Sequence, residues 1–225
     1  MPLLEFENVS KVYSSEGQPV HALQDVSVQF ERGAFVALVG RSGCGKSTLL
    51  HLAAALDFPS AGRVLLDGVC TTGLADAELA ALRRNKTGFV FQSFQLLNTL
   101  SAVENVELPL LLAGRAAARE RALQILSWVE LDSLATRLPH QLSGGQMQRV
   151  AIARSLALNP SLLLADEPTG NLDSTTGEMI LRLLGKINRE QGATIVMATH
   201  SLESAAFAGA AIRLKDGRIE ETIPA

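Results

Sequence analysis

Residues 40–47 of the sequence have the residue types and the spacing of a loop that holds a chain of phosphates. They read Gly-Arg-Ser-Gly-Cys-Gly-Lys-Ser and fit the pattern G-x-x-x-x-G-K-[ST] between a strand-like and a helix-like segment. Glycines allow tight turns, so that backbone N–H groups can face an anion. We expect Lys46 to reach the β- and γ-phosphates and Ser47 to hold Mg²⁺. The expected nucleotide-binding residues are Gly40, Arg41, Ser42, Gly43, Cys44, Gly45, Lys46, Ser47 and Thr48.

Two further interpretations of this loop are simpler or more specific. A glycine-rich turn without a ligand is possible in principle, but the strand before it and the helix after it favour the phosphate site. Cys44 occupies a variable position of the pattern. Its thiol could regulate the loop by oxidation, since a helix terminus lowers a thiol pKa. The alternative, a small residue that fits, is favoured because nothing nearby supports a sensor.

A second chemical element is an apolar strand that ends in two carboxylates, at residues 162–167. Asp166 at the strand tip can hold Mg²⁺ directly or through water. Glu167 is expected to point to the other side of the pleat and to polarise a water that attacks the γ-phosphate. The alternative is a solvated acidic strand end without a ligand. The phosphate loop upstream favours the magnesium site and the general base over this alternative.

Two more elements complete the set. Residues 142–146, Leu-Ser-Gly-Gly-Gln, precede a helical pattern, so Ser143 would cap a helix whose first turn presents free backbone amides to an anion. His200 follows the apolar strand at 194–199, where it could touch a γ-phosphate. A lone histidine is usually structural, but this one closes a series of elements in fixed order.

The elements that must position these residues follow from apolar patterns. Continuous apolar runs at 34–39, 162–165 and 194–198 suit parallel strands covered on both faces, whereas alternation at 4–6 and 26–30 suits half-buried antiparallel strands. Helical patterns occupy most of the stretch from 93 to 148. We therefore expect an α/β fold in one domain, residues 1–225, with a core lobe at about 1–92 and 149–225 and a helical lobe at about 93–148.

Three local signals add detail. Ser101 and Glu104 have capping-box spacing and predict a helix start, and Pro109 is expected to kink or end that helix. The pair Asp216-Gly217 predicts a hairpin turn near the C-terminus. Trp128 lies beside an apolar helical stripe and is expected to pack rather than to bind a ligand.

Composition bounds the class of protein. Of 225 residues, 47% are hydrophobic and 19% charged, a globular balance, and the net charge of -3 argues against nucleic acid as a partner. The two cysteines have no disulfide or zinc spacing, which indicates a reducing compartment. No signal pattern and no apolar run of the ~20 residues needed to span a bilayer is visible, so any membrane part is expected to come from another subunit.

Together, the loop at 40–48, Gln92, residues 142–146, Asp166-Glu167, residues 171–173 and His200 resemble the nucleotide-binding subunit of the ABC transporter family over nearly the whole chain. The resemblance implies a P-loop NTPase (RecA-like) core with an antiparallel β subdomain and an inserted helical subdomain. It also implies an ATPase that uses ATP and Mg²⁺.

Further residue roles are implied by the resemblance alone. Tyr13 would stack on adenine, and Gln92 would link Mg²⁺ and the attacking water to the helical lobe. His200 would steady the transition state, and Asp173 would cross a dimer interface. The γ-phosphate of ATP bound to the other subunit would be gripped by Ser143, Gly144, Gly145 and Gln146.

Within that family, residues 91–97, 103–106 and 165–173 resemble the branch of macrolide exporters, lipoprotein-releasing systems and cell-division regulators. Ser201 and Met147 depart from the common Asp and Gln, and both are expected to be tolerated. The implied partners are a second copy of the chain, in a head-to-tail dimer, and an integral membrane permease that docks on residues 94–112. The chain is then peripheral to the cytoplasmic face of the inner membrane.

Three functions compete on this evidence. The leading one couples ATP-driven dimerisation to export or lipoprotein release. A second is a regulator of the same fold whose membrane partner signals to a cell-wall enzyme without transport. A third, a soluble ATPase of the same family acting on DNA or the ribosome, usually has two nucleotide sites or a long coiled coil, and the sequence has neither.

Overall fold

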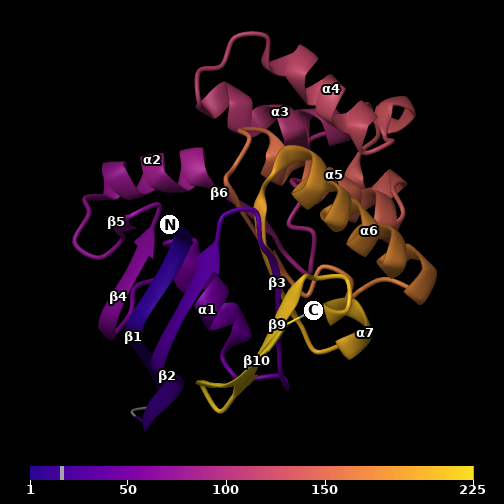
Figure 1. Ribbon diagram of the computed structural model, residues 1–225. Coiled ribbons are helices and arrows are strands. Elements are labelled where there is room, and N and C mark those ends of the chain that lie inside the picture. The colour runs from indigo at the N-terminus through magenta and orange to yellow at the C-terminus, as the bar shows by residue number, and fades with distance from the viewer. Residues whose placement is uncertain (16–17, 225) are drawn as a thin grey trace.

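The computed structural model describes residues 1–15 and 18–224, and its centre is a six-stranded sheet of order β10-β9-β3-β8-β7-β6 (Figure 1). The strands are β3 (Phe35–Val39), β6 (Thr87–Val90), β7 (Leu162–Asp166), β8 (Thr194–Thr199), β9 (Ala210–Lys215) and β10 (Arg218–Pro224). All neighbours pair in parallel except β9 and β10. The continuous apolar runs therefore do form parallel strands, as expected.

Both faces of this sheet are buried, each in its own hydrophobic cluster. Along β3, Ala37 faces the cluster formed with the helices, while Val36 and Leu38 face the cluster formed with the antiparallel sheet. Because side chains alternate along a strand, a strand covered on both sides needs apolar residues at every position. This requirement explains the absence of alternation in the sequence.

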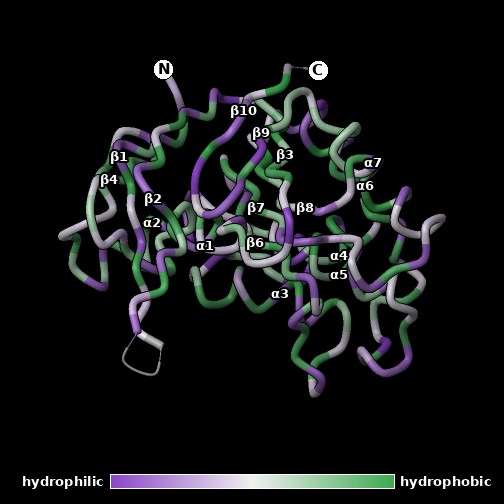
Figure 2. The backbone as a smooth tube through the Cα atoms, turned by 90° about the horizontal axis from the view of Figure 1, so that it is seen from below, coloured by the Kyte–Doolittle hydropathy of each residue, from purple (hydrophilic) through white to green (hydrophobic). Residues whose placement is uncertain are grey.

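The antiparallel sheet has the order β2-β1-β4-β5 and lies to one side of the molecule in Figure 2, with β3, β7 and β8 between it and the helices of residues 118–205. Its strands are β1 (Pro2–Ser15), β2 (Gln18–Glu31), β4 (Ala61–Leu66) and β5 (Val69–Cys70). The inward residues Phe6 and Phe30 are buried and meet edge to face, with ring centroids 6.3 Å apart. The alternating segments are thus half-buried antiparallel strands, as predicted.

One helix begins at the phosphate loop. Several others cover the face of the six-stranded sheet that is turned away from the antiparallel sheet (Figure 1). They are α1 (Lys46–Ala53), α2 (Asp76–Lys86), α3 (Ala102–Leu112), α4 (Ala118–Trp128), α5 (Gly144–Leu156), α6 (Ser174–Gln191) and α7 (Leu202–Ala205), with short 3-10 turns at Asp132–Leu134 and Pro139–Gln141. One continuous helix, α5, runs across residue 148, where the sequence placed a lobe boundary. None of the helices described here is both long and apolar enough to cross a membrane.

The local signals mostly agree with the structure. Ser101 is the N-cap residue of α3, and its backbone N–H donates to the Glu104 carboxylate at 2.7 Å. Pro109, however, lies inside α3, which continues to Leu112, so the expectation that the helix could end there is wrong. The turn at Asp216-Gly217 joins β9 to β10, as expected.

Candidate active site

The phosphate loop follows the buried strand β3 and leads directly into α1. Gly45, the N-cap residue of α1, has φ +108°, a left-handed backbone that residues with a side chain resist. A Cβ atom at this position would also lie 2.5 Å from the carbonyl oxygen of Ala22 on β2. Both facts require glycine here, and the result is a tight loop whose last residue directs the start of α1 toward the site.

Lys46 is the buried cation of this loop. Its side chain is only 6% exposed, and Nζ donates to the carbonyl oxygens of Gly40 at 2.8 Å and Arg41 at 3.2 Å. The same ammonium lies 3.7 Å from Oε1 of Glu167. The charge is therefore held over the loop, beside a carboxylate that comes from a distant part of the chain.

Ser47 and Asp166 bring two oxygen ligands together. The Ser47 hydroxyl donates to Oδ1 of Asp166 at 3.1 Å, although 119 residues separate them in sequence. Within residues 1–15 and 18–224 there is no cluster of three or more His, Cys, Asp or Glu that could hold a metal. A hydroxyl and one carboxylate nevertheless suit Mg²⁺, which takes few protein ligands and fills its octahedron with water and phosphate oxygens.

Glu167 follows the last residue of β7 and has φ +46°, so it turns out of the strand. Its backbone N–H donates to the carbonyl of Ala198 on β8 at 3.0 Å. Oε2 of Glu167 lies 2.8 Å from Nδ1 of His200. The expectation that Glu167 is directed by the pleat of the strand is therefore wrong, because a left-handed turn after the strand directs it.

The segment at Ser143 forms the start of α5, and a capping box holds it. The Ser143 N–H donates to Oε1 of Gln146 at 2.8 Å, and the Gln146 N–H donates back to the Ser143 hydroxyl at 3.3 Å. Gly145 lies against α6 of its own chain, where an added Cβ would be 2.3 Å from Cγ2 of Thr176. In the part of the chain that the structure describes, no hydrogen bond or ion pair joins residues 142–146 to residues 40–48.

Asp173 and Gln92 lie near this helix start. Asp173 is the N-cap residue of α6, and it accepts hydrogen bonds from the Thr176 hydroxyl at 2.6 Å and the Thr176 N–H at 3.0 Å. These bonds lower the pKa of Asp173 below its usual value. The exposed Gln92 follows β6, and its carbonyl accepts from the Asn171 side chain at 3.0 Å. A Cβ on Gly170 would come within 2.8 Å of the Gln92 amide nitrogen, so this side chain lies over the turn that follows Glu167.

Tyr13 lies on β1 and is 37% exposed. Its hydroxyl donates to Oδ2 of Asp57 at 2.8 Å. Burial and this bond to a carboxylate raise the pKa of Tyr13, while the side chain of Thr48 acts in the opposite direction. The aromatic ring is thus beside a residue of the phosphate loop, and Asp57 is a neighbour that sequence analysis missed. No pattern around Asp57 marks it, although Lys11, on the same side of β1 as Tyr13, could have been noticed from its spacing of two.

Cys44 is buried in the cluster between α1 and the antiparallel sheet, with Leu23 and Leu214 among its members. A Cβ on Gly40 would lie 2.6 Å from its sulfur atom. Burial in apolar surroundings limits access to the thiol, which supports the interpretation of Cys44 as a small residue that fits.

The structure thus joins the loop at 40–48, Asp166, Glu167 and His200 through direct contacts, whereas the start of α5 has no hydrogen bond or ion pair to that loop among the described residues. A family model described as ABC transporter matches residues 23–170. An uncharacterised ABC transporter ATP-binding protein of Methanocaldococcus jannaschii, MJ0796, is 48% identical over 224 residues, which are 97% of this chain and 95% of that protein. The dimeric structure of MJ0796 in a post-hydrolysis state bound to ADP and Pi has a TM-score of 0.91 to this chain, with 98% of each chain covered and 47% identity.

Two relatives have functional names. A lipoprotein-releasing system ATP-binding protein, LolD, of Myxococcus xanthus is 46% identical over 223 residues, 98% of this chain and all of that protein (100%). A macrolide export ATP-binding/permease protein, MacB, of Syntrophobacter fumaroxidans is 46% identical over 224 residues, which are 98% of this chain but 31% of that protein.

Proposed function

This chain belongs to the ABC transporter family as an ATP-binding ATPase subunit, and we propose that two copies assemble head to tail and enclose two ATP molecules. The observation that carries the proposal is that the start of α5 packs on α6 of its own chain and, among the described residues, makes no hydrogen bond or ion pair with the loop at 40–48. Each chain then offers a phosphate loop and, elsewhere, a capped helix start with free amides. The structures of MJ0796 are dimeric, and this supports a dimer here.

Within each site, three side chains of the chain that supplies the phosphate loop would have separate roles. Lys46 would leave the carbonyls of Gly40 and Arg41 to bind the β- and γ-phosphates, since charge-assisted bonds to phosphate are stronger than bonds to neutral carbonyls. Glu167 would accept a proton from the attacking water as general base. His200, 2.8 Å from Glu167, would hold that carboxylate in place and contact the γ-phosphate.

We assign the Mg²⁺ site to Ser47 and Asp166, with Gln92 as a third contact. When bound, Mg²⁺ supplies positive charge that neutralises the phosphate oxygens. The hydroxyl of Ser47 and the carboxylate of Asp166 already meet at 3.1 Å, which supports this assignment. Tyr13 would stack on the adenine ring, and Ser143 with Gly144, Gly145 and Gln146 would grip the γ-phosphate held by the other copy. Asp173 would then lie at the interface between the copies.

A complementation experiment tests the shared site. Lys46→Ala damages only the phosphate loop, and Ser143→Arg damages only the start of α5. Each variant alone is expected to be inactive, because both of its sites contain one damaged half. In a mixed dimer, one site combines both damaged halves while the other combines both intact halves, so mixing the two inactive variants restores ATPase activity.

The mixing result discriminates between the two architectures. If each chain formed a complete site by itself, the mixture would stay as inactive as its components. Thermal unfolding of both variants serves as the control for folding. A rise in the rate per chain with protein concentration, for the unmodified chain, is expected from the same dimerisation.

We further propose that an integral membrane permease docks on residues 94–112 at the cytoplasmic face of the inner membrane, and that the pair exports a substrate or releases lipoproteins. The similarity to LolD and MacB supports this role. Leu111 and Leu112 are 57% and 73% exposed at the end of α3, whereas Val103 and Val106 of the same segment are buried, so the docking surface is narrower than the sequence suggested.

Co-purification of a permease, and its loss in a variant with Leu111→Ser and Leu112→Ser, tests the docking. Substrate flux in vesicles that contain both subunits tests the transport.

A further inference from the structure

The side chain of Tyr13 is held by two charged residues outside the phosphate loop. Lys11 Nζ donates to Oδ1 of Asp57 at 2.6 Å, and the Tyr13 hydroxyl donates to Oδ2 of the same carboxylate at 2.8 Å. The Lys11 side chain is 12% exposed and the Asp57 side chain 30%, so this ion pair is partly shielded from water. One carboxylate therefore bridges an ammonium and a phenol.

Lys11 also restricts the ring itself. Its ammonium lies 4.8 Å from the centroid of the Tyr13 ring, within the range of a cation–π contact. It donates a further bond to the carbonyl of Phe58 at 2.8 Å, which fixes it in this position. With one ring face occupied by the ammonium, a flat base has the opposite face on which to stack.

Asp57 connects this ring to the phosphate loop. It lies in the segment between α1 and β4, and α1 begins at Lys46 inside the loop. The same segment is joined to β1 a second time, because the Ser60 N–H donates to the carbonyl of Ser10 at 2.8 Å and the Val12 N–H donates to the Ser60 hydroxyl at 3.1 Å. The spacing between ring and loop is thus set by α1 and the contacts at its far end.

The ionisation of the carboxylate agrees with this arrangement. Burial by itself would raise the pKa of Asp57, but the bonds from Lys11 and Tyr13 outweigh it and leave the pKa of Asp57 lowered. The carboxylate is therefore charged at neutral pH and pairs with the ammonium. Because the carboxylate accepts a hydrogen bond from the phenol O–H, the Tyr13 hydroxyl is directed at Asp57 and away from a ligand.

We propose that Lys11 and Asp57 are positioning residues for the nucleotide base, because they fix the tilt of the Tyr13 ring and its distance from the phosphate loop. This inference rests on the proposed stacking of Tyr13 on adenine, and it adds two residues that touch the base only through Tyr13. Their effect falls on binding of the base and leaves the phosphates and the hydrolytic step unchanged.

The test compares ATP with inorganic tripolyphosphate, a probe that has the phosphates but no base. For Asp57→Ala, KM for ATP is expected to rise about 5- to 20-fold, the range that partial loss of a base–aromatic stacking contact covers, at unchanged kcat. The inhibition constant of tripolyphosphate against ATP hydrolysis is expected to stay within about twofold of the unmodified chain, because this ligand does not reach Tyr13. For Asp57→Asn, which keeps the shape of the side chain and an acceptor for the phenol, KM for ATP is expected to lie between that of the unmodified chain and that of Asp57→Ala. This variant carries the test if Asp57→Ala does not fold.

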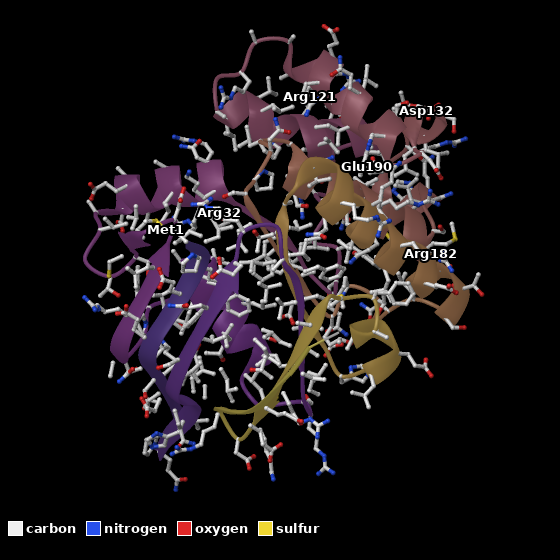
Figure 3. All side chains as sticks on the ribbon, in the orientation of Figure 1. Met1, Arg32, Arg121, Asp132, Arg182 and Glu190 are labelled. Carbon is white, nitrogen blue, oxygen red and sulfur yellow. The ribbon has the colours of Figure 1, made fainter. Side chains whose placement is uncertain are left out.

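Asp67→Ala is a matched control. Asp67 also pairs with two cations, Arg32 (labelled in Figure 3) and Lys86, and these bonds likewise lower its pKa. It lies in the turn between β4 and β5, and neither of its cationic partners bonds to residues 40–48 or Tyr13 in the described part of the chain. Its loss is expected to leave KM for ATP unchanged, so an equal rise would show a general effect of removing an ion pair and would overturn the proposal.

A double-mutant cycle separates this proposal from the stacking role on which it rests. In a chain with Tyr13→Ala, adding Asp57→Ala is expected to change KM for ATP by less than about twofold, since the ring that it positions is gone. If Asp57→Ala raises KM equally with and without Tyr13, or raises the tripolyphosphate constant as much as KM, the positioning role is refuted while stacking stands. If Tyr13→Ala alone leaves KM unchanged, the stacking role itself is refuted, and the proposal with it.

Discussion

The Nδ1 atom of His200 lies 2.8 Å from Oε2 of Glu167, although the two residues follow different strands of the parallel sheet. The other carboxylate oxygen lies 3.7 Å from the Lys46 ammonium. Glu167 is therefore placed between two nitrogen groups, and its direction is set by a left-handed turn just after β7. A base held in this way needs little reorganisation when water is delivered to it.

The first prediction concerns that base. Glu167→Gln keeps the size of the side chain but removes its ability to accept a proton, so kcat is expected to fall by about 10²- to 10⁴-fold. ATP binding should persist, and the dimer should become long-lived, because hydrolysis no longer opens it. Single-turnover hydrolysis and size-exclusion chromatography with ATP measure the two effects.

Glu203→Gln is the control for this variant. Glu203 is an exposed residue in the first turn of α7, close in sequence to His200 but outside the site. It is expected to hydrolyse ATP at the normal rate. Parental hydrolysis in Glu167→Gln would mean that another group takes the proton.

The second prediction concerns the cation. Lys46→Ala removes the only side-chain ammonium that bonds within the loop at 40–48 in the described residues, so ATP affinity is expected to fall about 10- to 100-fold and ATP-dependent dimerisation to disappear. Isothermal titration with ATP and light scattering measure these changes. Lys215→Ala, at an exposed ion pair with Glu220 on the β9–β10 hairpin, should change neither. Tight ATP binding by Lys46→Ala would contradict the assignment of the phosphate loop.

The third prediction concerns the start of α5. Gly145→Ala would place a Cβ 2.3 Å from the Thr176 methyl group, and this overpacking is expected to destabilise the chain by about 1–3 kcal/mol, partly offset by the better helix propensity of alanine. The double variant Gly145→Ala, Thr176→Ser removes that methyl group and should recover most of the lost stability. Thermal unfolding measures both.

Gly177→Ala is the matched control, since its Cβ would make only ordinary contact with Thr169, 3.4 Å away. It is expected to keep or raise Tm. If Gly145→Ala were as stable as the unmodified chain, glycine at this position would have no packing role within its own chain. In the double variant Gly145→Ala, Thr176→Ser, the packing within the chain is restored. A loss of ATPase activity in this variant would therefore report on the contact to the other copy.

The fourth prediction concerns pH and Asp173. Hydrogen bonds from Thr176 lower the pKa of this carboxyl in the folded chain, so its charged form stabilises the fold above the unfolded pKa of about 3.9. That contribution is lost as the pH falls through the lower, folded pKa. Against Asp173→Asn, which does not titrate, the unmodified chain should have the higher Tm at pH 7, and the difference should shrink as the pH is lowered below about 4. A difference that stays constant with pH would contradict a role of the charge in capping α6.

Local pattern was sufficient for much of this protein. The phosphate loop could be predicted because its strand, glycines, lysine and serine are contiguous in residues 35–47. The buried strands could be predicted because burial on both faces demands an unbroken apolar run, and the start of α5 could be predicted because a capping box involves residues only three apart. Contiguous signals of this kind depend on short-range backbone geometry, which the sequence by itself determines.

Only the tertiary structure determined which residues that are distant in sequence come into contact. The bridge from Lys11 through Asp57 to Tyr13 joins residues 44 and 46 positions apart, and no pattern around Asp57 marks it. Glu167 has a left-handed backbone just after β7, so alternation along the strand could not predict its direction. The packing of the start of α5 on α6 of its own chain likewise exists only in three dimensions. Such relationships depend on how packed layers bring distant side chains together, and that packing is a property of the whole chain rather than of any one segment.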